Sequence, residues 1–142
     1  MIRFKRTLDD YQFYSTSNNI SYWEEIDEDK LQVAIDLFQS ELNWDKMWSV
    51  DDAKQRLKDG WLFSVLEIDN KLRGWYWLNY DIKESFNLYV HKNHRGYGYG
   101  FGLISYIITA AKLRQLDYVI AQVDEWNTAS QKLLLKCGFV DE

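Results

Sequence analysis

The sequence predicts a single α/β domain built on a mixed sheet, and three observations support this. The chain has 142 residues, a length that suits one domain. Hydrophobic residues make up 46% of it and aromatic residues 17%, which is enough to build a core. Stretches typical of strands alternate several times with stretches of helical spacing, and no repeat or linker interrupts them. We therefore expect one domain over residues 1–142, with an N-terminal extension at 1–19 and a core at 20–142.

The first half of the chain begins with a short strand and two helices. Residues 21–26 (SYWEEI) are β-prone, and residues 27–42 carry apolar side chains at helical spacing behind an acidic first turn. A second, shorter helix is expected over residues 49–60. Ser49 can cap its start and Gly60 can follow its end.

The next thirty residues predict an antiparallel meander. Residues 61–90 contain three β-rich runs, separated at Asp69-Asn70 and at residues 81–84 by reversals short enough for hairpins. A helix with a buried apolar face is expected after Gly102, and residues 118–123 (YVIAQV) read as a buried strand. A last helix begins near Asn127 and ends at Gly138.

Composition excludes several functions. Cys137 is the only cysteine, and with two histidines it leaves too few ligands for a structural zinc site, so we expect no metal. The net charge of −5 argues against a nucleic-acid partner. No leader sequence opens the chain and no apolar run approaches the ~18 residues that span a bilayer, so we expect a cytoplasmic protein without a membrane partner.

The stretch RGYGYG, residues 95–100, is the strongest functional signal. A strand that enters a glycine-rich turn and leaves it as a helix presents unpaired N–H groups, which suit a phosphate. A P-loop needs Lys and Ser/Thr after its last glycine, but Phe101 follows Gly100. A dinucleotide fingerprint fits poorly, because Leu103 stands where its last glycine would be. What remains is R-x-x-G-x-G, formed by Arg95, Gly98 and Gly100.

With these residues in place, the sequence resembles the GCN5-related N-acetyltransferase (GNAT) family. The family pattern of a valine, RGxGxG, a helix, a strand, an asparagine and a final GF is matched by Val90, RGYGYG, YVIAQV, Asn127 and CGF. The match is good from residue 84 to residue 139. It implies a GNAT-like acyl-CoA N-acyltransferase fold and an acetyl-CoA-dependent N-acetyltransferase. The acceptor would be a primary amine of a small molecule, a peptide or a protein.

The resemblance also implies roles for individual residues. The pantetheine arm of acetyl-CoA would pair with the backbone around Leu88 and Val90, and its pyrophosphate would sit on the N–H groups of residues 95–100. The implied cofactor-binding residues are Leu88, Tyr89, Val90, Arg95, Gly96, Tyr97, Gly98, Tyr99, Gly100 and Asn127. Glu84 occupies the position of a carboxylate that takes the amine proton through water. The alternative for Glu84 is a solvated turn carboxylate beside Lys83.

Two departures from the family pattern matter. Leu134 stands where many members have a tyrosine proposed to protonate the leaving thiolate. That departure keeps open a second function, a catalytically silent module that binds CoA or another protein. The chain also ends three residues after Phe139, where the family continues into a last strand, so we expect that strand to be missing. We expect residues 1–19, with the β-prone pieces IRF and YQFYS, or a partner chain in a homodimer, to occupy that place beside residues 118–123.

The acceptor is the least constrained feature. Several aromatic residues lie in segments that border the acceptor cleft of the family, and each is either cleft wall or core. They are Trp44, Trp48, Trp75, Tyr76 and Trp77. An aromatic and acidic cleft would favour a cationic amine.

Overall fold

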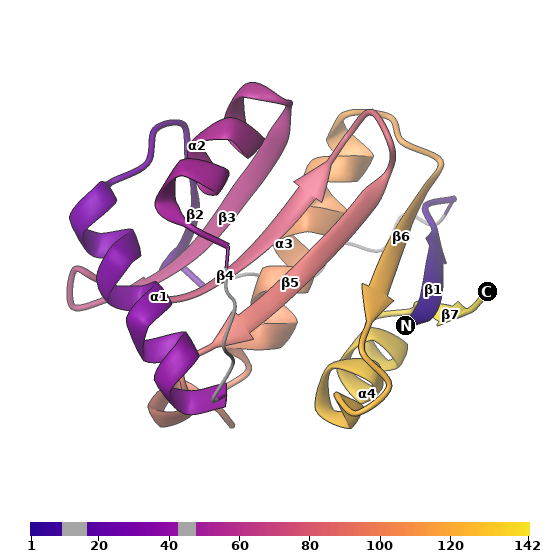
Figure 1. The fold of residues 1–142 in the computed structure, drawn as a ribbon. Helices are drawn as coiled ribbons and strands as arrows, with labels where there is room; N and C mark the ends of the chain where they lie inside the picture. Colours follow the sequence, from indigo (N-terminus) through magenta and orange to yellow (C-terminus); the bar gives the residue numbers. More distant parts are fainter. Residues whose placement is uncertain (10–16, 43–47) are drawn as a thin grey trace.

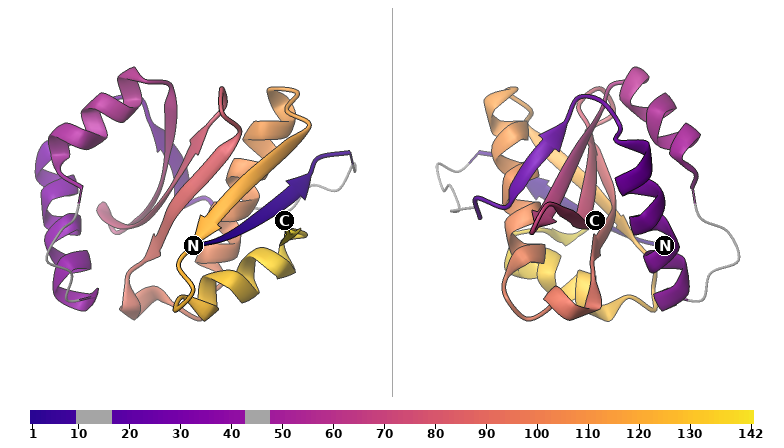
Figure 2. Two further views of the ribbon diagram at one scale, coloured as in Figure 1. Left: turned by 45° about the vertical axis from the view of Figure 1, so that its right-hand side comes forward. Right: turned by 90° about the vertical axis from the view of Figure 1, so that its left-hand side faces the viewer.

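The computed structural model describes residues 1–9, 17–42 and 48–142, and within them a seven-stranded mixed sheet carries helices on both faces (Figure 1). The strand order is β2-β3-β4-β5-β6-β1-β7. Helices α1 and α2 cover one face, and α3 and α4 cover the other (Figure 2). The elements are β1 (Ile2–Thr7), β2 (Ile20–Trp23), α1 (Glu28–Leu42), α2 (Val50–Lys58), β3 (Trp61–Ile68), β4 (Lys71–Asn79), β5 (Glu84–Val90), a 3₁₀ turn (Lys92–His94), α3 (Tyr99–Leu113), β6 (Tyr118–Val123), α4 (Thr128–Lys136) and β7 (Val140–Asp141).

The first two predicted helices form, with the buried face and the end residues that the sequence predicts. Helix α1 buries the predicted apolar stripe against the sheet, with Leu31, Ala34, Ile35 and Phe38 each at most 3% exposed. The Ser49 side chain accepts from the N–H of Asp52, and the Asp52 carboxylate accepts from the N–H of Ser49. This capping box begins α2. Gly60, at φ 89°, follows the end of α2.

The meander β3-β4-β5 is antiparallel throughout, as predicted. Asp69 and Asn70, both with positive φ, form the tight turn between β3 and β4. Strand β5 contains a bulge, because Trp75 pairs with Tyr89 while Trp77 pairs with Phe86. The extra residue near the bulge is Asn87, which has a φ of 61°.

Strands β5 and β6 run parallel but separate after two pairs. Glu84 pairs with Ile120 and Ser85 with Ala121, and no later residue of β5 pairs with β6 among those described. Figure 1 shows the two ribbons diverging toward the end of β5. The backbone along one edge of β5 is therefore left without a strand partner.

The N-terminal strand occupies the place beside β6, which confirms that part of the prediction. Strand β1 pairs antiparallel with β6 over its whole length, with Phe4 opposite Ala121. The expectation that the last strand is missing was wrong, because residues after Phe139 form the two-residue strand β7. It pairs with the outer edge of β1 and not with β6. The second predicted piece, YQFYS, lies outside the described residues.

A buried arginine ties β1 to the end of α4. Arg6 is 4% exposed, and its Nε donates to the carbonyl of Cys137 at 2.9 Å. Its Nη1 donates to the carbonyl of Thr7 at 2.7 Å. A cation at a helix C-terminus satisfies the last carbonyl groups and suits the helix dipole. Gly138 follows at φ 90°, and a Cβ there would lie 2.7 Å from the Arg6 Nε.

None of the helices described is long and apolar enough to cross a membrane.

Candidate functional site

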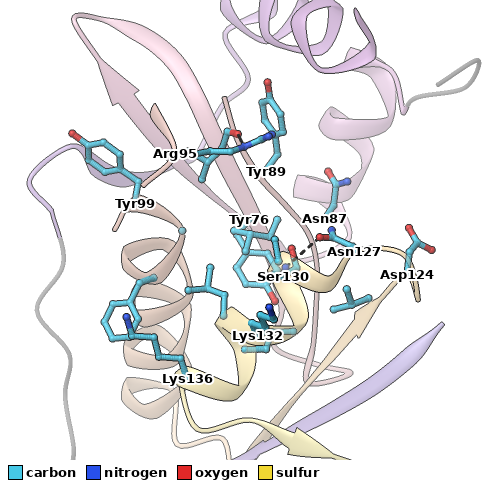
Figure 3. A pocket seen from close by; sticks show the side chains of 18 of the residues that line it. Tyr76, Asn87, Tyr89, Arg95, Tyr99, Asp124, Asn127, Ser130, Lys132 and Lys136 are labelled. Atoms are coloured by element: carbon cyan, nitrogen blue, oxygen red, sulfur yellow. Dashed lines mark hydrogen bonds between the residues drawn. The ribbon is translucent and has the colours of Figure 1, made fainter. Parts of the chain in front are cut away.

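A pocket of about 680 Å³ lies where β5 and β6 separate. Its walls come from the end of β5, the glycine loop with the start of α3, the end of β6, and α4 (Figure 3). The pocket thus joins the two features predicted to bind the cofactor, the edge of β5 and the glycine loop.

The strand edge of β5 offers free backbone groups to this pocket. The N–H of His91 donates to the carbonyl of Arg73 at 2.7 Å, so this residue points its peptide groups toward β4. Because peptide groups alternate along a strand, those of Leu88 and Val90 point the other way, toward the gap. One of them is already engaged, since the Val90 carbonyl accepts from Arg95 Nε at 2.9 Å. An extended ligand with amide groups could pair with the remainder.

The glycine loop forms a potential anion-binding site. Gly98 caps the start of α3 in a left-handed conformation (φ 83°), with no side chain satisfying the helix end. The first intrahelical bond runs from the N–H of Gly102 to the carbonyl of Gly98, so the amides of Tyr99, Gly100 and Phe101 have no partner within the helix. A Cβ on Gly98 would meet no atom within 4 Å, so this side of the loop is open to a ligand.

Gly100 serves a different purpose. A Cβ at this position would lie 2.8 Å from Cδ2 of Leu133 in α4. The missing side chain allows the first turn of α3 to approach α4 closely. Gly98 therefore leaves room for a ligand, whereas Gly100 leaves room for helix packing.

The Arg95 side chain is held by an ion pair with Glu41. Its Nη2 lies 2.5 Å from Oε1 of Glu41, at the end of α1, and Oε2 of Glu41 accepts from the hydroxyl of Tyr89 at 2.9 Å. Burial, followed by the neighbouring Glu41 carboxylate, raises the pKa of Tyr89. Glu41 thus connects α1 to β5 and the glycine loop. No local sequence pattern links Glu41 to the glycine motif, so its role was not predicted from the sequence.

Glu84 lies apart from the pocket. It begins β5, and its Oε1 is 3.8 Å from Nη1 of Arg3. The neighbouring Ser85 side chain bonds Tyr76 on the α3 side, so by strand alternation Glu84 faces the side of α1 and α2. Lys83 pairs with Asp117 instead of Glu84. A catalytic role for Glu84 stays a prediction.

Helix α4 contributes the other wall. Asn127 accepts from the N–H of Ser130 at 3.2 Å and so caps α4, while also lining the pocket. Leu134 lines the pocket as well and is 1% exposed. Lys132 and Lys136 add positive charge to this wall, and neither was predicted from the sequence. Figure 3 shows both lysines on α4, across the pocket from Arg95.

The remaining predicted residues are divided between site and core. Tyr99 lines the pocket, whereas Tyr97 is 74% exposed and does not line it. Trp75 and Trp77 are fully buried under α1 and α2, so they belong to the core. Tyr76 faces the other way and lines the pocket. Trp44 lies outside the described residues.

The lining of the pocket suits a CoA thioester. An apolar slot beside a free strand edge suits an extended amide arm, and the glycine loop suits its pyrophosphate. In the part of the chain that the structure describes, no group of three or more His, Cys, Asp or Glu could hold a metal ion.

Comparison with solved structures places this geometry among known folds. A GNAT-family protein of Novosphingobium aromaticivorans is 16% identical, with a TM-score of 0.70 over 99% of this chain and 59% of that one. A ribosomal-protein-alanine N-acetyltransferase of Brucella melitensis is 23% identical, with a TM-score of 0.66 over 85% of this chain and 83% of that one. A Salmonella typhimurium protein solved with its cofactor acetyl-CoA is 20% identical, with a TM-score of 0.65 over 86% and 79%.

At these identities the structural likeness shows the fold alone. This chain spans 59% of the length of the Novosphingobium protein. The curated proteins gave no match. The sequence model of the acetyltransferase (GNAT) family, however, matches residues 20–139, which include the meander, the glycine loop and α4. Family model and fold agree, and the chain belongs to the GNAT acetyltransferase family.

Proposed function

We propose that the protein is an N-acetyltransferase that transfers an acetyl group from acetyl-CoA to a primary amine. One observation carries this proposal. The pairing of β5 with β6 stops at Ser85, and the edge that it leaves free leads to the open glycine loop. An extended arm ending in a pyrophosphate has the shape and the polar groups that this continuous surface requires.

Different residues of the pocket would bind different parts of the cofactor. The free peptide groups of Leu88 and Val90 would bond the amides of the pantetheine arm, as a strand partner does. The amides from Gly96 to Phe101 would bond the pyrophosphate. Lys132 and Lys136 would offset the phosphate charge from the α4 side.

The acceptor would arrive on the other face of the sheet, where Glu84 lies. An amine must be neutral to attack a thioester, and a nearby carboxylate can take its proton, directly or through water. Glu84 is 3.8 Å from Arg3, which keeps positive charge beside it. The acceptor is expected to be a small-molecule or peptide amine.

Buried Leu134 supports the alternative of a catalytically silent module that binds CoA or another protein, because it offers no proton to a leaving thiolate. The cytoplasmic location and the homodimer stay predictions.

The test begins with calorimetric titration of acetyl-CoA, followed by a thiol-release assay over a panel of amines. Glu84→Gln should lower turnover by about 10²-fold at neutral pH, and by less at high pH where the free amine is abundant. Its acetyl-CoA affinity should not change. Glu142→Gln is the matched control, since Glu142 is the other carboxylate that contacts Arg3.

Each result has a distinct meaning. Wild-type turnover of Glu84→Gln at every pH would refute the role of Glu84. Acetyl-CoA binding without thiol release for any amine would favour the silent module. Failure to bind acetyl-CoA would refute both the transferase and the CoA-binding module, and would favour a module that binds another protein.

A further inference from the structure

The pocket contains a hydroxyl group that the family resemblance does not predict. Tyr76, on β4, lines the pocket together with Leu134. Figure 3 shows Tyr76 in the middle of the pocket, between the Arg95 end and the lysines of α4. A tyrosine from the sheet therefore stands near the place where the family has a tyrosine from α4.

The Tyr76 hydroxyl is part of a short chain of hydrogen bonds. It lies 2.8 Å from Oγ of Ser85, and either oxygen can be the donor. The Ser85 Oγ also donates to the carbonyl of Ile120 at 3.2 Å. Ser85 is the last residue of β5 that pairs with β6, so this hydroxyl pair lies at the point where the strands separate. That point is the inner limit of a cofactor arm laid along β5.

Helix α4 brings the missing tyrosine's position to the same corner. Leu134 and Tyr76 belong to the same buried hydrophobic cluster, and both line the pocket. Leu134 and Tyr76 thus approach the corner from two elements.

We propose that Tyr76 donates a hydrogen bond to the sulfur of CoA as the thioester breaks, in place of the tyrosine that Leu134 replaces. The inference rests on the proposed function. As the C–S bond breaks, its electron pair stays on sulfur, and the Tyr76 O–H stabilises that negative charge. The proton remains on Tyr76, and the thiolate takes a proton from water once it is released.

The hydrogen-bond chain allows this without moving a heavy atom. The Ser85 proton can turn from the Ile120 carbonyl to the Tyr76 oxygen. The Tyr76 proton is then free to turn toward the sulfur. Burial raises the pKa of Tyr76, so the hydroxyl stays neutral and remains a donor at every working pH.

The experiment measures the ionisation of the CoA thiol while it is bound, which does not depend on turnover. CoA is bound to wild-type protein, to Tyr76→Phe and to Tyr80→Phe, and thiolate absorbance is followed during a pH titration. Tyr80 is the matched control, a partly buried tyrosine just after the same strand whose ring lies under Arg114, outside the pocket. A donor to the thiolate lowers the pKa of the bound thiol.

We expect the bound thiol to titrate below free CoA in the wild type and about one unit higher in Tyr76→Phe, a tenfold change in its ionisation constant. Tyr80→Phe should match the wild type. Turnover of Tyr76→Phe should fall by about tenfold or more at saturating acetyl-CoA.

Two results would overturn the proposal. One is a bound thiol in the wild type that titrates at or above the value of free CoA, a measurement that needs no variant. The other is a folded Tyr76→Phe protein with the wild-type thiol pKa. Ser85→Ala, which keeps the Tyr76 donor, should retain the lowered thiol pKa and so separates the hydroxyl from general packing. If the wild type binds no CoA, the proposed function itself has failed.

Discussion

Replacing Arg6 with methionine should destabilise the protein far more than a substitution on an ordinary edge strand. Arg6 is buried in the sheet interior, with hydrogen bonds to the carbonyls of Cys137 and Thr7. Methionine keeps much of the apolar stem but donates nothing. The Cys137 carbonyl, at the C-terminus of α4, would then lose a charged donor.

The expected loss follows from these two bonds. A hydrogen bond from a charged donor contributes about 1.5–3 kcal/mol, and removing the guanidinium also removes the cost of burying it. We therefore expect the free energy of unfolding to fall by about 3 kcal/mol. For a chain of this size the melting temperature should fall by roughly 10 °C.

Urea unfolding followed by circular dichroism measures this difference. Arg3→Met is the control on the same strand, because the Arg3 side chain is 47% exposed and pairs with Glu142 at the surface. Surface ion pairs contribute about 0–1 kcal/mol, so this control should change little. Equal losses in the two variants would show that β1 is not held by Arg6.

Two further predictions concern the loop and the pH dependence of stability. Gly98→Ala should weaken acetyl-CoA binding more than tenfold in calorimetry, since its methyl group would enter the open side of the loop. Gly60→Ala is the control, because Gly60 has a similar left-handed conformation (φ 89°) but lies away from the pocket. This variant should be less stable but should bind acetyl-CoA with wild-type affinity. Equal affinities in both folded variants would refute phosphate binding at the glycine loop. Burial, then Arg73, lowers the pKa of His91, so the unfolded state binds more protons and stability should fall as pH drops through about 6.5. His91→Asn should flatten this decline in urea unfolding between about pH 7 and 5, and an unchanged slope would assign it to other groups.

Local signals predicted most of the fold because they act over a few residues. Ser49 and Asn127 cap helices wherever the chain places them, and Asp69-Asn70 forms a tight turn without help from distant contacts. The glycine motif belongs to the same class, since φ values and helix starts are local properties. The strand IRF was predicted from its alternation and from the place left open beside residues 118–123.

The rest depends on contacts between distant segments. Nothing near Glu41 indicates that its carboxylate would hold both Arg95 and Tyr89. Likewise, Trp75 and Tyr76 are neighbours of similar character, and the strand alternation alone sends one to the core and the other to the pocket. A pattern of period two fixes which residues share a face, but not which helix covers that face.

The position of β1 has a consequence for folding kinetics. Arg6 and Cys137 are 131 positions apart in the chain, and β1 lies between β6 and β7, both from the last quarter of the sequence. Contacts of such long sequence separation form slowly, because a long loop must close before they stabilise anything. The strand nearest the N-terminus should therefore dock late, after α4 has formed, and variants of Arg6 should accelerate unfolding while leaving the refolding rate almost unchanged.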